Sequence, residues 1–78
     1  MANNTYDMVM SGKSDCNIRF SDFRNLLLSY GFVERIKGSH HVYKRGDIPE
    51  GIVIQPIQNK AKAYQVKQVR KLFIKYNL

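Results

Sequence analysis

Apolar residues recur at steps of three and four in two segments of the chain, which is the spacing of one face of an α-helix. In the first segment these residues are Phe23, Leu26, Leu27 and Tyr30. Ser21 is a suitable N-cap, Gly31 can take the left-handed conformation after the last turn, and Phe32 can fold back onto the helix. We therefore expect an amphipathic helix over residues 21–30.

The second helical segment covers residues 63–76. Its apolar residues share one side of the helix, and they are Val66, Val69, Leu72, Phe73 and Tyr76. Three lysines at four-residue intervals line the opposite side, and they are Lys67, Lys71 and Lys75. This pattern predicts a C-terminal helix with one face in the core and one basic face.

Between the two helices the pattern changes to a period of two, which is typical of β-strands. Residues 32–37 alternate between a largely apolar and a mostly polar face, and Gly38-Ser39 follows as a two-residue turn. Residues 40–45 form the second predicted strand. The β-branched residues 52–54, bounded by Gly51 and Pro56, form the third, after a loop over residues 46–51.

These elements bury their apolar faces most simply in two layers, with both helices on one side of an antiparallel three-stranded sheet. The sequence thus predicts an α+β fold of α-β-β-β-α order, the architecture of the double-stranded RNA-binding domain. Residues 6–10 are predicted to form a short helical turn and residues 11–15 a loop. We expect one domain over residues 1–78, with residues 1–17 as an N-terminal extension.

The charge balance narrows the choice of partner. Thirteen Lys and Arg against six Asp and Glu give the 78-residue chain a formal net charge of +7. Such an excess favours RNA or DNA over a neutral metabolite. A membrane surface is the competing polyanion, but the C-terminal stretch has the periodicity of an ordinary core helix.

The number of cysteines and the length of the apolar segments indicate the cellular compartment of the protein. Cys16 is the one cysteine, so no intrachain disulfide can form, and we expect it to be buried or half-buried. The sequence shows neither a signal-peptide pattern nor a long apolar run, so a reducing, cytoplasmic setting is expected.

The candidate chemistry lies in the stretch Gly38-Ser39-His40-His41-Val42-Tyr43. RNA is cleaved when a base takes the 2′-hydroxyl proton, an acid protonates the leaving oxygen and cations stabilise the charge on phosphorus. Histidine changes its charge near neutral pH, so His40 is the candidate proton-transfer group. Ser39 is a candidate to orient the imidazole or to donate to a phosphate. The cations that flank the turn are Arg35, Lys37, Lys44 and Arg45.

Each of these residues also has a plain structural interpretation. A surface histidine in a turn is most often only a surface residue, and the sequence does not decide which sheet face His40 takes. His41 points to the opposite face, where pairing across the strand or covering the sheet is favoured. Tyr43 either stacks on a base or packs, and sheet aromatics more often pack. The stripe Lys67, Lys71 and Lys75 is either a solvated face or a phosphate track.

A metal-dependent nuclease fits the sequence less well. Two-metal cleavage of a phosphodiester requires clustered carboxylates, whereas the acidic residues here are dispersed along the chain. A zinc site on His40 and His41 is disfavoured because neighbours on a strand point to opposite faces and no third ligand is evident. We expect no metal and no other cofactor.

Several motifs resemble the HicA toxins, also called YcfA-like proteins. They are Ser11-Gly12-Lys13-Ser14-Asp15, Ile18-Arg19-Phe20, Gly31-Phe32, residues 38–43 and residues 60–70. The resemblance implies a ribosome-independent mRNA interferase of a type II toxin–antitoxin pair, folded like a double-stranded RNA-binding domain and neutralised by a HicB antitoxin. It also implies that His40, within Gly38-Ser39-His40, is the catalytic histidine.

The sequence departs from the family pattern at one position. Many family members carry a second histidine close to the proline that follows the third strand. Here Pro56 is followed by Ile57-Gln58-Asn59, so a role given to that histidine has no counterpart.

Three functions of different classes follow from these observations. The favoured one is an RNA endonuclease that uses His40. The second is a non-catalytic RNA-binding module with the same fold and charge. The third is an interaction subunit whose basic surface binds an acidic protein, such as a cognate antitoxin that covers His40.

Overall fold

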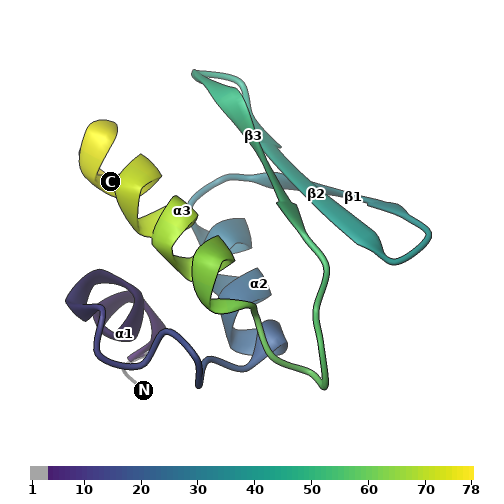
Figure 1. Ribbon diagram of the computed structural model, residues 1–78. Coiled ribbons are helices and arrows are strands. Elements are labelled where there is room, and N and C mark those ends of the chain that lie inside the picture. The colour runs from purple at the N-terminus through teal and green to yellow at the C-terminus, as the bar shows by residue number, and fades with distance from the viewer. Residues whose placement is uncertain (1–3) are drawn as a thin grey trace.

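The computed structural model describes residues 4–78. The elements in chain order are α1 (Thr5–Ser11), α2 (Phe20–Ser29), β1 (Val33–Lys37), β2 (His40–Arg45), β3 (Ile48–Ile54) and α3 (Ala63–Lys75). The strands form one antiparallel sheet in the order β1-β2-β3, and α2 and α3 pack on the same side of it (Figure 1). The predicted α+β fold of double-stranded-RNA-binding-domain type is confirmed, with α1 added in front of it.

The core lies between the sheet and the two long helices. Tyr43, Ile52 and Ile54 cover the inner face of the sheet and are fully buried or nearly so. The helices contribute Phe23, Leu26, Leu27, Val66, Val69, Leu72 and Phe73 to the same cluster. The helical residues of this cluster are among those that the three-and-four spacing assigns to apolar faces, so for the two helices the local pattern and the packing agree.

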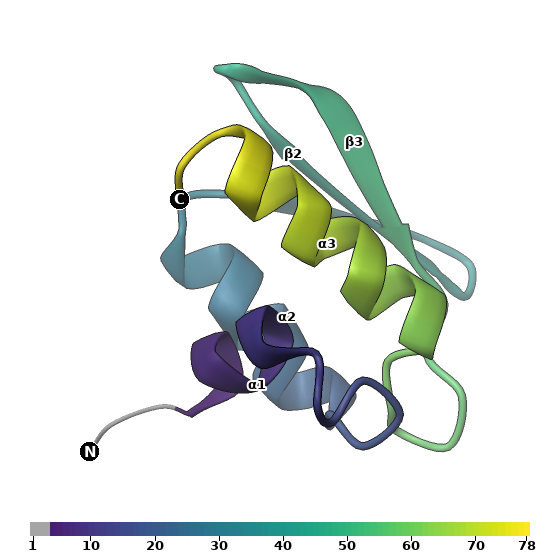
Figure 2. The same ribbon diagram turned by 60° about the vertical axis from the view of Figure 1, so that its left-hand side comes forward.

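The N-terminal helix belongs to the same packed body (Figure 2). Val9 is fully buried in the core cluster. The guanidinium of Arg70 on α3 donates to the carbonyl of Val9 at 2.9 Å and to both carboxylate oxygens of Asp15 at 2.9 and 3.1 Å. The helical turn predicted for residues 6–10 is confirmed, and residues 1–3 of the expected extension lie outside the described residues.

The N-cap of helix α2 lies two residues earlier than predicted. Ser21 is not the N-cap, because Phe20 is already helical and Arg19 occupies the cap position with an extended backbone and no side-chain cap. The N–H of Phe20 instead donates to the carbonyl of Asn59 at 2.7 Å. A bond from a distant loop therefore replaces the local cap that the sequence favoured.

The end of α2 agrees with the prediction. Gly31 has a φ of 88°. Its N–H donates to the carbonyl of Leu28 at 3.1 Å, and the N–H of Phe32 donates to that of Leu27 at 3.2 Å. These two bonds form a Schellman motif. Since Phe32 and Leu27 are both buried, the motif fixes the direction in which the chain enters β1.

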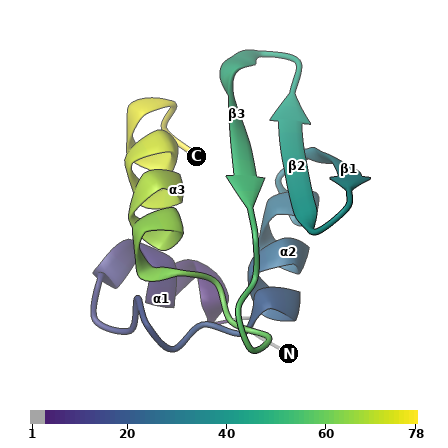
Figure 3. The same cartoon turned by 45° about the vertical axis from the view of Figure 1, so that its right-hand side comes forward.

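Strand β3 starts at Ile48, so the loop predicted over residues 46–51 is wrong beyond Gly46-Asp47 (Figure 3). Ile48 pairs with Arg45 and is buried. Pro49 is tolerated because β3 is an edge strand, where a missing N–H need not break a ladder bond. In the sequence Pro49 indicated a turn, but the burial of Ile48 favours a strand at this point.

Helix α3 ends at Lys75, with Tyr76 as its C-cap. Lys67 and Lys71 are exposed on its basic face, as predicted. Cys16 is exposed, contrary to the expectation, because it lies in the loop between α1 and α2 outside the core. Within residues 4–78 no helix is long and apolar enough to cross a membrane.

Candidate functional site

The two histidines of β2 lie on opposite faces of the sheet. Antiparallel partners share a face, and His40 is paired with Lys37. Tyr43 is paired with Glu34 and is fully buried against the helices. Since side chains alternate along a strand, His41 faces the helices with Tyr43, and His40 faces outward.

His40 begins β2 directly after the Gly38-Ser39 turn. Gly38 has a φ of 57°, the left-handed conformation that such a tight turn requires. His40 is exposed, and its imidazole makes no hydrogen bond or ion pair with any of residues 4–78. Ser39 is also exposed, and its hydroxyl does not contact the imidazole by a hydrogen bond. The ring is therefore open to a ligand from the outer side of the sheet.

Three of the predicted cations lie on the same outer face as His40. Lys37 is its direct cross-strand partner, and Arg35 and Lys44 follow on the same face of β1 and β2. All three are exposed. None of them forms an ion pair with a carboxylate of the described part of the chain. The outer face consequently carries uncompensated positive charge next to an imidazole.

The remaining predicted cations are not brought to this face. Arg45 forms an ion pair with Asp47, with 2.9 Å between Nε and Oδ1. Lys75 donates to Glu50 at 2.6 Å. Lys67 and Lys71 lie on α3, which packs on the opposite side of the sheet from His40. A phosphate track on α3 would thus be separate from the surface around His40.

Valines complete the outer face. Val33 and Val53 are 65% and 47% exposed. Half-buried Val42 lies between them as the partner of Arg35 and Val53. The outer face therefore combines apolar side chains with cations.

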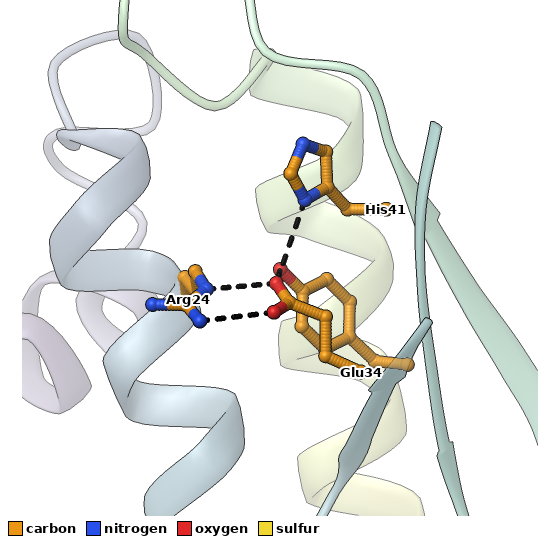
Figure 4. A network of polar contacts seen from close by, with 4 residues as sticks. Arg24, Glu34 and His41 are labelled. Atoms are coloured by element: carbon orange, nitrogen blue, oxygen red, sulfur yellow. Dashed lines mark hydrogen bonds and ion pairs between the residues drawn. The ribbon is translucent and has the colours of Figure 1, made fainter. Parts of the chain in front are cut away.

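A polar network lies on the inner face, under His41 (Figure 4). Arg24 of α2 holds the carboxylate of Glu34 by two bonds of 2.8 and 2.9 Å. The buried Tyr43 hydroxyl donates to Glu34 at 2.6 Å, and Nδ1 of His41 lies 3.4 Å from the same oxygen. The bonds from Arg24 and then Tyr43 lower the pKa of Glu34 to about 2. Burial, with the Glu34 carboxylate next to the hydroxyl, raises the pKa of Tyr43.

His41 is held in one orientation by this network. An ionised carboxylate can only accept, so Nδ1 carries the hydrogen and Nε2 is left on the far side of the ring, as Figure 4 shows. The ring packs edge-on against Phe20, with 4.7 Å between centroids and 64° between planes. His41 and Tyr43 thus occupy packed positions, in agreement with the structural interpretation of both residues.

Arg24 and Glu34 were not among the site residues predicted from the sequence. One signal for Glu34 was present, since the alternation of residues 32–37 places it on the apolar face between Phe32 and Ile36. A carboxylate at such a position needs a partner. Nothing local indicates that the partner is Arg24, because the two residues belong to different elements.

A cavity of about 530 Å³ lies where α2 begins, against the turn that precedes α3. It is lined by Arg19, Phe20, Ser21, Gln58, Asn59 and Lys60. The sequence analysis did not predict this cavity. Over residues 4–78 no group of three or more His, Cys, Asp or Glu side chains is placed to hold a metal ion.

The fold and the outer face together define a small basic domain of double-stranded-RNA-binding-domain type with an exposed imidazole among free cations. A sequence model of one family, described as HicA toxin of bacterial toxin–antitoxin, matches residues 20–74, from α2 almost to the end of α3. The chain belongs to the HicA toxin family and is therefore a toxin of a toxin–antitoxin pair. No curated protein and no solved structure matches the chain.

Proposed function

We propose that this toxin is a ribosome-independent mRNA interferase, an endonuclease that cuts RNA with His40 as the proton-transfer group and without a metal. The observation that carries the proposal is the position of His40. Its imidazole is open to solvent and stands directly opposite Lys37 across a tight turn. Arg35 and Lys44 lie on the same face, and no carboxylate of residues 4–78 neutralises them.

The chemistry follows from these groups. His40 takes the proton of the 2′-hydroxyl, the 2′-oxygen bonds to phosphorus, and the bond from phosphorus to the 5′-oxygen breaks. The imidazolium formed in the first step is the acid that returns a proton to the leaving 5′-oxygen. Lys37 and Arg35 stabilise the extra negative charge on the phosphoryl oxygens. Ser39, which is exposed in the turn, donates to a phosphate in this proposal.

A HicB-type antitoxin is the proposed protein partner. The outer face, with Arg35, Lys37 and Lys44 uncompensated, suits a partner surface that carries carboxylates. A partner bound there would cover His40 and exclude RNA.

The test is RNA cleavage by purified wild-type protein and by His40→Ala on a long transcript, with EDTA in both reactions. The wild type is expected to cut, and the variant is expected to be slower by about 10²–10⁴-fold, the usual contribution of a positioned acid–base group. Circular dichroism and a urea titration check that the variant is folded. Cleavage at the parental rate by a folded His40→Ala protein would show that the assignment is wrong.

A non-catalytic RNA-binding module is the second candidate, and one observation favours it. The His40 imidazole has no hydrogen-bond partner among residues 4–78 that would fix its tautomer, whereas His41 has one. Purified wild-type protein that binds the transcript and never cuts it, with or without EDTA, would select this function.

A further inference from the structure

Two cations face each other at the cavity between α2 and the turn before α3. Arg19 and Lys60 form an isolated antiparallel bridge, so their backbones lie side by side, and both side chains are exposed and line the cavity. Like charges directly opposite each other on paired backbones destabilise a fold. Neither residue forms an ion pair within residues 4–78. The arrangement therefore leaves a repulsion that an anion would relieve.

The rest of the lining fits an anion with hydrogen-bonding groups. Gln58, Asn59 and Ser21 supply amides and a hydroxyl, and no carboxylate lines the cavity. Asp22 is the nearest acid in the sequence, but it is exposed and not part of the lining. Gln58 and Asn59 have φ values of 51° and 63°, a left-handed conformation that forms the turn and brings Lys60 back towards Arg19.

The cavity is also physically joined to the strand that carries His40. Phe20 lines it, and the Phe20 ring also packs edge-on against the ring of His41. His41 is paired with Ile54, the last residue of β3, from which the chain runs into the turn that forms the cavity wall. His40 directly precedes His41 on β2, and its side chain points to the outer face. The start of β2 and the end of β3 therefore lie at the same end of the sheet, and the chain continues from there into the cavity wall, so this end is the path on which one extended polyanion would contact both places.

We propose that this cavity binds a phosphate of the RNA strand, one nucleotide or more away from the bond that is cut, through Arg19 and Lys60. This inference rests on the proposed function and deepens it. Arg19 and Lys60 act as positioning residues, because they hold the substrate without touching the reacting atoms. Ser21, Gln58 and Asn59 contact the same nucleotide by hydrogen bonds.

The test measures binding of a fluorescein-labelled single-stranded RNA at several salt concentrations. His40→Ala is the parent protein, so that the RNA is not cut during the measurement. Arg19→Gln and Lys60→Gln are compared with Lys13→Gln, which removes one charge from an exposed residue outside the cavity. Each cavity variant is expected to bind about tenfold more weakly, and its plot of log affinity against log salt is expected to lose about 0.7 in slope for the lost phosphate contact.

The same two substitutions in the catalytically competent protein separate positioning from chemistry. KM for RNA is expected to rise about tenfold with kcat nearly unchanged. Cavity variants that bind RNA with the affinity and the salt slope of Lys13→Gln would overturn the cavity proposal while leaving the His40 assignment intact. If His40→Ala cuts RNA normally, the binding comparison is made with 2′-O-methylated RNA, which has no 2′-hydroxyl to attack phosphorus. Weak binding by the cavity variants would then mean that the catalytic assignment fails and the cavity proposal stands.

A second arm distinguishes RNA from a small free anion. Inorganic phosphate and adenosine 5′-monophosphate are titrated into the protein, and the backbone amide signals of Phe20 and Asn59 are followed by nuclear magnetic resonance. Both signals are expected to shift with RNA at far lower concentration than with either small anion. Equal affinity for inorganic phosphate and for RNA would overturn the assignment of the site to the RNA strand.

Discussion

His40 and His41 are neighbours in the chain and opposites in environment. His40 stands on the outer face, exposed, beside cations that no carboxylate within residues 4–78 neutralises. His41 stands on the inner face, where a Glu34 carboxylate and the Phe20 ring hold it in place. Because side chains alternate along a strand, one of two adjacent histidines is open to a ligand and the other is fixed in the interior.

The largest expected effect comes from removing each of the two rings in turn. His40→Ala should remove cleavage by about 10²–10⁴-fold at unchanged stability, whereas His41→Gln should leave cleavage within about tenfold and lower the stability instead. RNA cleavage and urea unfolding are measured for both proteins. If His41→Gln abolishes cleavage and His40→Ala does not, the inner ring is the chemical one.

The next largest effect concerns the carboxylate of Glu34, which holds the network on the inner face. Glu34→Gln replaces a charged acceptor for Arg24 and Tyr43 by a neutral amide, and the free energy of unfolding should fall by about 1–3 kcal/mol. Urea titrations at pH 7 give the difference from the wild type. Asp47→Asn is a suitable control, because its exposed carboxylate pairs with Arg45 at the surface and should cost little. Equal losses in the two variants would contradict a special role for the network.

The pH dependence of stability tests the same network. Its contacts lower the pKa of Glu34 from 4.5 to about 2 in the folded protein. A lowered folded pKa stabilises the protein above the unfolded value, so this contribution should be lost as pH falls from 4.5 towards 2. Lys75 and Tyr76 lower the pKa of Glu50 to about 2 as well, so part of the acid sensitivity arises there.

The two contributions are separated by comparing Glu34→Gln and Glu50→Gln with the wild type between pH 2 and 6. Each variant should show a shallower fall of the urea midpoint than the wild type. An unchanged fall in Glu34→Gln would mean that the inner carboxylate is not held by its partners in solution.

The smallest expected effect is the difference in RNA affinity between removing a lysine from the sheet and removing one from helix α3. Lys37→Gln on the outer face should weaken RNA binding several-fold, because Lys37 stands opposite His40 without a carboxylate partner in the described chain. Lys75→Gln should have almost no effect, since Glu50 already compensates that charge. Both are measured in the His40→Ala protein at low salt. Equal losses of RNA affinity in the two variants would mean that RNA contacts both the outer face of the sheet and helix α3.

Local patterns predicted the fold well because its elements carry their own signals. The three-and-four spacing from Phe23 to Tyr30 gave α2, Gly31 gave its end, and the alternation from residue 32 gave β1. The predictions failed where a distant partner decides the local structure. The Asn59 carbonyl starts α2 before Ser21, and the burial of Ile48 extends β3 through Pro49.

The candidate site, like the fold, could be predicted only in part from the sequence. Local sequence was enough to predict the charge excess, the Gly38-Ser39-His40 turn, the strand that follows it and, through the motifs, the family. Three features became evident only in the folded protein: His40 faces outward, Arg24 reaches Glu34, and Arg19 meets Lys60 at a cavity. The reason is physical, because periodicity is encoded within a few residues, whereas the face that is buried and the side chains that meet depend on the packing of separate elements.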